Sequence, residues 1–320
     1  MPGTREWAIS KLRQWAGLPN AAAGYDEQCA HLRRQMGIND AAPLTAIKQY
    51  GEYRTGTNAL RALLLENFDN ALVLMYLLGD KHHDAVDFAA LASALSAEHS
   101  DPARIILNTT WGRPGGMTRR ENFAQIAFTH AFALQIQTSV TSRSLRAVLS
   151  IRHPLTWMEA VTRFWLWPPQ STGDPWLEAE ELEFAKGLCQ RFNARYSNWS
   201  QAVDALGERA RIVHFETLEE RWPSVVNDLA TAFPLHRRHN QPVRSRRTVE
   251  PSPWDNAPPR YSNAKHQKRA LRRPRLRKEL EAIVKNEIDW TLMKRFGYSP
   301  EPSEPLRTVP QAAQAAVAPV

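Results

Sequence analysis

One stretch near the start of the chain, residues 46–68, limits what the rest of it can fold into. It reads AIKQYGEYRTGTNALRALLLENF, and its second half places leucines and a phenylalanine at helical spacing. The first half can be extended, so a strand is expected to enter a helix through a short turn. That turn consists of one glycine, two threonines, an asparagine and an arginine: Arg54, Thr55, Gly56, Thr57 and Asn58.

This turn has the composition of a cradle for an anionic group. Glycine lets the backbone approach a ligand, and the first N–H groups of a helix lie unsatisfied at the positive end of its dipole. The guanidinium of Arg54 adds a planar fork that matches phosphate or sulfate oxygens. A simpler interpretation stays open, in which Gly56 and Asn58 only make a turn and begin the helix. The P-loop of nucleoside triphosphatases, G-x-x-x-x-G-K-S/T, is absent.

Length and composition indicate an ordinary globular protein. With 320 residues the chain can bury a full core, and one large domain with tails is the economical interpretation. No run of about 18 apolar residues is present, which argues against a membrane-spanning helix. The first ten residues, MPGTREWAIS, lack the apolar core of a secretory signal, and Cys29 and Cys189 are too few for a disulfide framework. A reducing, cytoplasmic setting is therefore expected.

Charge is distributed unevenly along the chain. The net charge is +8, but residues 236–278 hold 14 Lys and Arg against two acidic residues, so the remainder is mildly acidic. A strongly basic segment on an acidic body indicates an anionic ligand. Nucleic acid, an anionic membrane surface and a polyanionic cofactor are all candidates.

The two ends of the chain are expected to lie outside the main domain, which spans 43–298. Residues 1–42 are expected to be a helical extension, with Trp7, Leu12 and Trp15 near one face. Such a helix usually packs on its own domain, but it could instead make peripheral contact with a membrane surface. Residues 299–320, rich in Pro, Ala and Gln, are expected to form a disordered tail.

A candidate base follows an apolar run at 71–78, ALVLMYLL. The run is short enough for a buried parallel strand, though a buried helix is an alternative. It leads to Lys81, His82 and His83. Side chains at the carboxyl end of a parallel strand face the ligand in open α/β sheets, so His82 could accept a proton there. The alternative is three solvated residues in a loop.

A second anchor is the segment 145–154, LRAVLSIRHP. Residues 148–151 predict a short buried strand that delivers Arg152 at its carboxyl end, and Pro154 stops the strand. The alternative for Arg152 is a surface arginine at a strand end. Further strands are expected at 104–107 and 211–216. Helices are expected at 85–98, from 119, over 157–164, at 177–199, from a cap at Thr217, and from Pro274 to Gly297.

In their order and spacing, these motifs resemble the PAPS-dependent sulfotransferases over about residues 45–298. One branch of that superfamily carries Tyr-Gly-Glu-x-Arg/Asn-Ser/Thr-Gly-Thr-Asn, which reads YGEYRTGTN at 50–58 here. The same branch tends to show a Lys-His pair after the next strand, as at Lys81 and His82. The family's 3′-phosphate site, Arg-Asn/Asp-Pro after a strand, is similar to the segment from Arg152 to Pro154. A terminal helix that ends in Gly-Tyr is also usual in this family, and the last helix expected here ends at Gly297 and Tyr298.

The resemblance implies a P-loop NTPase-like, three-layer α/β/α fold with a central, mostly parallel sheet. It implies PAPS as co-substrate and transfer of a sulfuryl group to a hydroxyl or amine of a carbohydrate, lipid or small-molecule acceptor, without a metal. The roles carried over are 5′-phosphosulfate binding by Arg54, Thr55, Gly56, Thr57 and Asn58, 3′-phosphate binding by Arg152, proton acceptance by His82, and charge stabilisation by Lys81 and Arg54.

Two features depart from this resemblance. The family places a serine eight residues after the arginine, where this chain has Ala160, so Thr156 or Thr162 would have to replace it. The strand that enters the cradle carries Lys48 and Glu52, which is too polar for a fully buried parallel strand. We therefore expect that strand to be short or partly exposed.

Two other classes of function stay open from the sequence. An ATP-dependent phosphotransferase is one, although the missing Walker lysine argues against it. The other is a non-enzymatic binder of nucleic acid or membrane that works through residues 236–278. Nucleic acid is the less expected partner, and Glu52 is a second candidate base beside His82.

Overall fold

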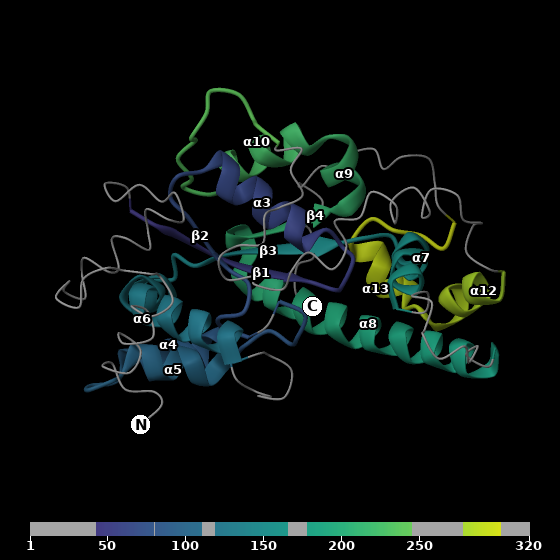
Figure 1. Ribbon diagram of the computed structural model, residues 1–320, viewed down its shortest axis with the longest axis horizontal. Helices are drawn as coiled ribbons and strands as arrows, with labels where there is room; N and C mark the ends of the chain where they lie inside the picture. The colour runs from purple at the N-terminus through teal and green to yellow at the C-terminus, as the bar shows by residue number, and fades with distance from the viewer. Residues whose placement is uncertain (1–42, 80, 111–118, 166–177, 245–277, 302–320) are drawn as a thin grey trace, which may run out of the picture.

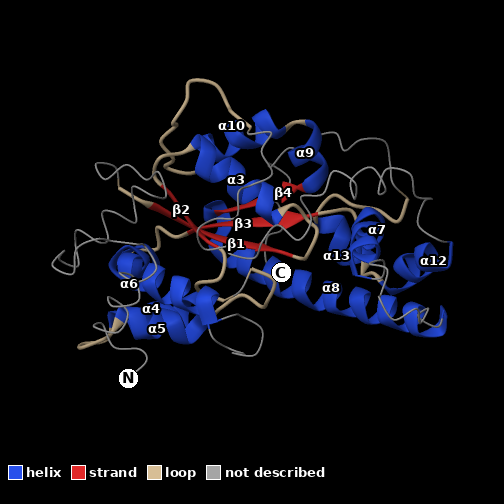
Figure 2. Ribbon diagram, viewed as in Figure 1, coloured by secondary structure: helices blue, strands red, loops and turns tan. Residues whose placement is uncertain are grey.

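A parallel β-sheet forms the centre of the molecule. The computed structural model describes residues 43–79, 81–110, 119–165, 178–244 and 278–301, and in these ranges the sheet has four strands (Figures 1 and 2). The strands are β1 (Thr45–Gly51), β2 (Ala71–Leu74), β3 (Arg146–Ile151) and β4 (Ala210–His214), in the order β2-β1-β3-β4. All three pairings between them are parallel, which confirms the expected α/β class.

Helices connect the strands and cover both faces of the sheet (Figure 1). Their bounds are α3 Thr57–Asn67, α4 Phe88–Ser96, α5 Pro102–Thr110, α6 Arg119–Thr141, α7 Pro154–Trp165, α8 Glu178–Leu206, α9 Phe215–Glu220, α10 Trp222–Ala232, α12 Lys278–Glu287 and α13 Trp290–Arg295. Alternate strand residues enter different apolar clusters, as the two-residue period of a strand requires. Ile47 and Val148 pack with α3 and α10, whereas Ala46 and Leu149 face the helices on the opposite side.

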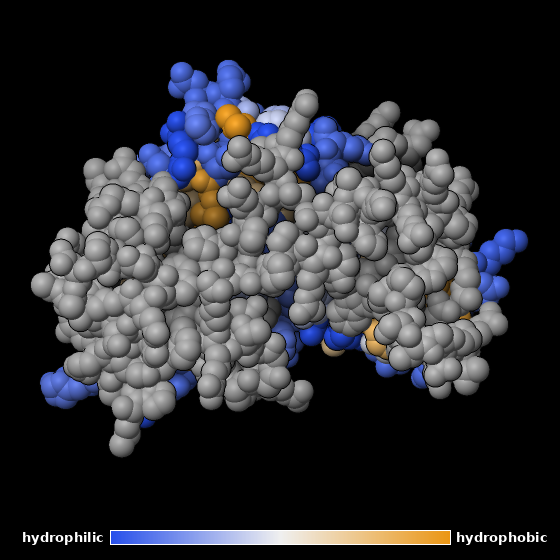
Figure 3. Space-filling view, viewed as in Figure 1, coloured by the Kyte–Doolittle hydropathy of each residue, from blue (hydrophilic) through white to orange (hydrophobic). Residues whose placement is uncertain are grey.

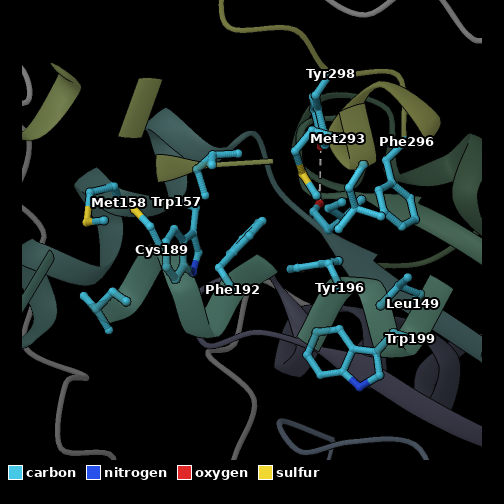
Figure 4. Packing of buried hydrophobic residues seen from close by; sticks show 14 of the residues in the cluster. Leu149, Trp157, Met158, Cys189, Phe192, Tyr196, Trp199, Met293, Phe296 and Tyr298 are labelled. Carbon is cyan, nitrogen blue, oxygen red and sulfur yellow. Dashed lines mark hydrogen bonds between the residues drawn. The ribbon is translucent and has the colours of Figure 1, made fainter. Parts of the chain in front are cut away.

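One aromatic row fixes the long helix α8 against the sheet. Phe192, Tyr196 and Trp199 lie along one face of α8 and are fully buried, as is Trp157 of α7 (Figure 4). The ring centroids of Trp157 and Phe192 are 4.5 Å apart, and those of Phe192 and Tyr196 are 4.3 Å apart. Aromatic pairs at such separations add to the free energy of simple burial. The row therefore gives α8 a defined position beside β3.

The entering strand β1 is neither short nor exposed, so that expectation was wrong. All seven of its residues are buried, and Lys48 and Glu52 have no exposed area. Both charges have partners from distant parts of the chain, as described below. Buried charges are tolerated when they are paired and hydrogen-bonded, and a strand that carries them need not look apolar.

Three other predictions of secondary structure were wrong. The strand expected at 104–107 lies inside α5, because Asp101 accepts a hydrogen bond from the Arg104 N–H at 3.1 Å and Pro102 begins the helix. The strand expected at 71–78 ends at Leu74, where the backbone turns. Thr217 lies within α9 rather than capping it, since the helix begins at Phe215.

The single terminal helix expected after Pro274 is two helices, α12 and α13. Asp289 breaks it by accepting a hydrogen bond from the Leu292 N–H at 2.9 Å, which caps α13. Asn193 of α8 forms hydrogen bonds with the backbone at the break. Its side-chain nitrogen donates to the Glu287 carbonyl at 2.7 Å, and its side-chain oxygen accepts from the Asp289 N–H at 3.0 Å. A distant side chain therefore decides where this helix ends.

Several predictions lie outside the described residues: the extension 1–42, most of the basic segment 236–278, and nearly all of the tail 299–320. Where the structure is described, no helix is long and apolar enough to cross a bilayer. On the face in Figure 3 the described surface over α10 and the chain after it is largely hydrophilic. Among described residues, the large hydrophobic side chains that are exposed are Leu134 and Val243.

Candidate functional site

The strand order places a topological switch point beside β1. The chain goes from β1 to β2 on one side and later to β3 on the other side. In open parallel sheets, ligands bind outside the carboxyl ends of the strands at such a point. The turn from Gly51 to Thr57 follows the carboxyl end of β1, and Arg152 follows that of β3. The two anchors found in the sequence therefore meet where this fold binds ligands.

The turn itself has a backbone that requires glycine at its end. Gly56 is the N-cap of α3 with a φ of 82°, in the left-handed region. A Cβ atom at Gly56 would lie 2.8 Å from the ring of Phe215 and 3.0 Å from the side chain of Leu218. Packing against α9 and the backbone angle thus account for this glycine whatever the turn binds. The anion-binding interpretation must depend on the other groups of the turn.

The start of α3 offers backbone donors at the site. No side-chain hydrogen bond caps this helix end in the described part of the chain. Two buried side chains instead hold the carbonyls of the turn: Ser150 donates to the Thr55 carbonyl, and Gln49 donates to the Thr57 carbonyl at 2.6 Å. Such bonds direct the turn's carbonyls into the protein. The first N–H groups of α3 therefore remain available to an anion at the positive end of the helix dipole.

The two threonines of the turn are buried, whereas its arginine and its asparagine are exposed. Thr55 is fully buried, and its hydroxyl donates to the Glu52 carbonyl at 2.7 Å, so its side chain holds the turn together. Thr57 is also buried, whereas Arg54 and Asn58 are exposed. Arg54 has a φ of 67°, which is uncommon for a residue with a side chain. The strain concentrates at the residue predicted to face the anion.

The segment after β2 is bonded directly to this turn. The ammonium of Lys81 donates to the side-chain oxygen of Asn58 at 2.7 Å, and the Lys81 carbonyl accepts from the Gly51 N–H at 3.0 Å. His82 Nδ1 lies 2.5 Å from the Gly51 carbonyl, and its ring stacks on Tyr53 with centroids 3.9 Å apart. Lys81 and His82 are both buried. The predicted base and its neighbour therefore lie beside the predicted cradle.

The environment of His82 favours its neutral form. Burial lowers its pKa well below 6.5, and the charge of Lys81 lowers it further. A carbonyl can only accept a hydrogen bond, so His82 Nδ1 must carry the proton and donate to Gly51. The second ring nitrogen, Nε2, then holds the lone pair. This tautomer is the one a proton acceptor needs.

Glu52, the second candidate base, is held by two arginines of α8. Its carboxylate oxygens lie 3.2 Å from Arg191 Nη2 and 2.5 Å from Arg195 Nη1, and its side chain has no exposed area. Both oxygens of this buried carboxylate are therefore paired with arginines. The sequence holds a local sign of the pair, because Arg191 and Arg195 have the i, i+4 spacing that puts them on one face of α8.

Arg152 lies beside the cradle, and its guanidinium contacts three residues. Its Nη1 donates to the Arg54 carbonyl at 3.3 Å, its Nε donates to the Thr156 hydroxyl at 3.1 Å, and its guanidinium lies 4.1 Å from the ring centre of Phe215. Of the two threonines considered in place of the missing serine, Thr156 is thus adjacent to Arg152. Thr162 instead donates to the Met158 carbonyl of its own helix, at 2.8 Å.

Glu216 is a further polar residue near Arg152, and the sequence did not single it out. Glu216 accepts from the His153 N–H at 3.0 Å and from the Tyr298 hydroxyl at 2.7 Å. His153 accepts from the Leu155 N–H on Nδ1, so its Nε2–H donates to the Ser299 carbonyl, at 2.9 Å. The Gly-Tyr end of the last helix is thereby attached to the strand that delivers Arg152. The local signal in the sequence was a glutamate two residues after the end of β4.

The described cations of the basic segment bond away from the cradle. Arg237 donates to Asn227 of α10 at 2.7 Å, Arg238 donates to the Phe68 carbonyl at 3.3 Å, and Arg244 pairs with Glu219 at 3.1 Å. The rest of the basic segment, residues 245–277, lies outside the described residues. In the ranges that are described, no group of three or more His, Cys, Asp or Glu side chains could hold a metal ion.

Together the fold and the site define a class: a parallel α/β protein with a cationic turn at the switch point of its sheet. Arg54, Lys81 and Arg152 supply three positive charges around the uncapped start of α3, and His82 supplies a neutral imidazole. No family model, curated protein or solved structure matches this chain.

Proposed function

We propose that this chain is a PAPS-dependent sulfotransferase with a P-loop-like fold. The observation that carries the proposal is the bond between Arg152 Nη1 and the Arg54 carbonyl, 3.3 Å long, across 98 residues of sequence. Arg54 and Arg152 are therefore neighbours, and the resemblance assigns them to two different phosphate sites of one nucleotide. Adjacent parallel strands bring their carboxyl ends together in any such sheet, so the support lies in what meets there: two guanidinium groups beside the N-terminal end of a helix.

The residues present fit the two anionic ends of PAPS, the 5′-phosphosulfate and the 3′-phosphate. The first would bind at the start of α3, where the N–H groups after Gly56 and the side chains of Arg54 and Asn58 are exposed to it. Thr55 would act by holding the turn, since its hydroxyl is used within it, and Thr57 would act through its N–H. Arg152 uses Nε and Nη1 within the protein, and its other N–H donors would serve the 3′-phosphate.

The protein's contribution to the reaction would be positioning and charge stabilisation, as in phosphoryl transfer. Bound PAPS supplies the sulfuryl group. Arg54 would neutralise the phosphate oxygen from which the sulfur departs, and Lys81, fixed on Asn58, would offset charge on the sulfuryl oxygens. His82 would take the acceptor's proton on Nε2 while that oxygen or nitrogen bonds to sulfur. Its Nδ1–H bond to Gly51 holds the ring in the required tautomer.

The acceptor is a hydroxyl or amine of a carbohydrate, lipid or small molecule, and no metal takes part in this scheme. An ATP-dependent phosphotransferase is the alternative that makes a different prediction at the ribose. ATP has a 3′-hydroxyl where PAPS has a phosphate. The role of Arg152 therefore separates the two.

Calorimetric titration tests this role. Adenosine 3′,5′-bisphosphate and adenosine 5′-monophosphate would each be titrated into the unmutated protein and into Arg152→Ala. Charge-assisted hydrogen bonds contribute about 1.5–3 kcal/mol each, so the bisphosphate should bind at least ~10²-fold more tightly to the unmutated protein. Arg152→Ala should lose most of that preference while its affinity for the monophosphate changes little.

The matched control is Arg211→Ala, which removes another partly buried arginine at the opposite end of the neighbouring strand β4. It should keep the preference for the bisphosphate. Equal affinities of the two nucleotides for the unmutated protein would mean that no 3′-phosphate site exists. The sulfotransferase proposal would then be wrong, and binding of ATP with magnesium would become the next measurement.

A further inference from the structure

A lysine in the middle of the sheet is bonded to the turn that carries the proposed base. Lys48 lies on β1 with no exposed area. Its ammonium donates to the carbonyls of Met75 at 3.3 Å and Leu77 at 3.1 Å, and also to the carbonyl of Gly79. An ammonium has three N–H donors and no acceptor, and a neutral amine has only two donors. Three carbonyls therefore match the charged form.

The turn wraps around this ammonium. It closes where the Lys81 N–H donates to the Met75 carbonyl at 2.7 Å. Inside it, Leu78 and Gly79 have φ values of 59° and 84°, two successive residues in the left-handed region. Leu78 is not a glycine and is fully buried, so this backbone is held at a cost. The conformation points the alternate carbonyls inward, where without a cation they would be buried beside one another.

The same turn delivers the two residues that the proposed reaction uses. Lys81 and His82 come directly after it and bond to Asn58 and Gly51 of the cradle. Lys48 and Gly51 are on the same strand. The middle of β1 is thus connected to the turn through the ammonium, and its carboxyl end is connected through the Gly51 backbone to Lys81 and His82.

We propose that Lys48 is a positioning residue: its ammonium acts as a tethered cation around which residues 75–79 fold, and this sets Lys81 and His82 against the cradle. The catalytic part of this proposal depends on the proposed function, but the placement of His82 does not. The polarity of β1, which argued against its burial, is the feature that builds the site. An apolar residue at position 48 would remove the ammonium donor from three converging carbonyls, and the Lys81 N–H would remain as a donor to that of Met75.

Chemical rescue tests the proposal. Lys48→Ala keeps Cβ and removes three carbons and the ammonium, which together correspond to n-propylammonium. Turnover of PAPS should fall about 10²-fold, the usual consequence of a misplaced catalytic group. Added n-propylammonium should recover most of that loss. Neither n-propanol, which has one donor and no charge, nor tetramethylammonium, which has no N–H, should do so.

A second measurement is independent of the reaction. Nitrogen-15 NMR of the imidazoles reports the tautomer of His82, with the proton on Nδ1 in the unmutated protein. Lys48→Ala should lose this signal pattern, and n-propylammonium should restore it. The affinity for adenosine 3′,5′-bisphosphate should change less than turnover does, because the Lys48 ammonium bonds to the carbonyls of Met75, Leu77 and Gly79 in the turn that carries His82. If the unmutated protein transfers no sulfate but His82 responds in this way, the proposed function fails and the positioning role stands.

Two variants guard against simple loss of folding. Lys48→Met fills the same space without a donor, and Ile47→Ala opens an apolar cavity at the next residue of β1, which is also fully buried. n-Propylammonium should raise the melting temperature of Lys48→Ala but of neither control. An unchanged His82 tautomer and turnover in Lys48→Ala, or equal responses of the three variants to n-propylammonium, would overturn the proposal.

Discussion

The ion pairs of Glu52 lead to a prediction that does not depend on any function. Replacing Glu52 by Gln keeps the shape of the side chain and removes its charge. One amide oxygen can still accept from one arginine, while the amide nitrogen would face the N–H groups of the other. Arg191 and Arg195 would then lie close together without their shared carboxylate.

The size of the effect follows from burial. Breaking a buried ion pair by removing one partner typically costs about 3–5 kcal/mol, because a charge is left without compensation. The side chains of Arg191 and Arg195 are 33% and 15% exposed, so water can reach them in part. The remaining amide oxygen also preserves one hydrogen bond. We therefore expect the free energy of unfolding to fall by about 3 kcal/mol, the lower end of that range.

Urea unfolding of Glu52→Gln and of a matched surface variant measures this. Arg295 and Asp204 form a pair of similar length, 2.7 Å, but their side chains are 54% and 57% exposed. Asp204→Asn should cost less than about 1 kcal/mol, as exposed pairs do. The dependence of free energy on urea should be the same for all three proteins. Equal, small losses in the two variants would refute the reasoning that burial makes the Glu52 pairs strong.

The remaining predictions concern the cradle and the proposed base. Arg54→Ala should lower transfer of labelled sulfate from PAPS by roughly 10²–10³-fold with stability unchanged, because the side chain is exposed; an unaltered rate would remove Arg54 from the reaction. His82→Asn should abolish most turnover but preserve nucleotide affinity. Since the pKa of His82 is lowered, the unfolded state binds the extra proton, and stability should decrease as pH falls below about 6.5, by about 1.4 kcal/mol per pH unit. Urea unfolding at pH values from 7 to 5 measures this dependence of stability on pH. It should be weaker in His82→Asn, where only the contribution of His153, whose pKa is also lowered, remains. The same dependence in both proteins would contradict a buried, neutral His82.

Local sequence was sufficient to predict the strands and helices that carry the candidate site. The helical spacing after Gly56, the apolar run before Arg152 and the stop at Pro154 each act within a few residues, and the structure has β1 followed by α3 and β3 followed by α7 at those places. The position of Lys81 and His82 beside the turn was also expected, because side chains at the carboxyl ends of parallel strands converge. The N-cap at Asp101, by contrast, was a local signal that was overlooked.

What local sequence could not supply was the set of partners of the buried charges. Lys48 appeared unsuited to a buried strand because its three carbonyl partners lie 27 to 31 residues away, in a turn that follows the neighbouring strand β2. The same turn ends β2 at Leu74, four residues earlier than its apolar run predicted.

By itself, the sequence determined a parallel α/β fold, a strand-to-helix turn rich in potential anion-binding groups, and an arginine at the end of a second strand. Only the tertiary structure decided that the two meet, that Glu52 pairs with Arg191 and Arg195, and that Lys48 bonds to the turn that precedes His82. The physical reason is that a buried charge is stable only where distant segments bring its partners to it, and no local pattern records which segments those are.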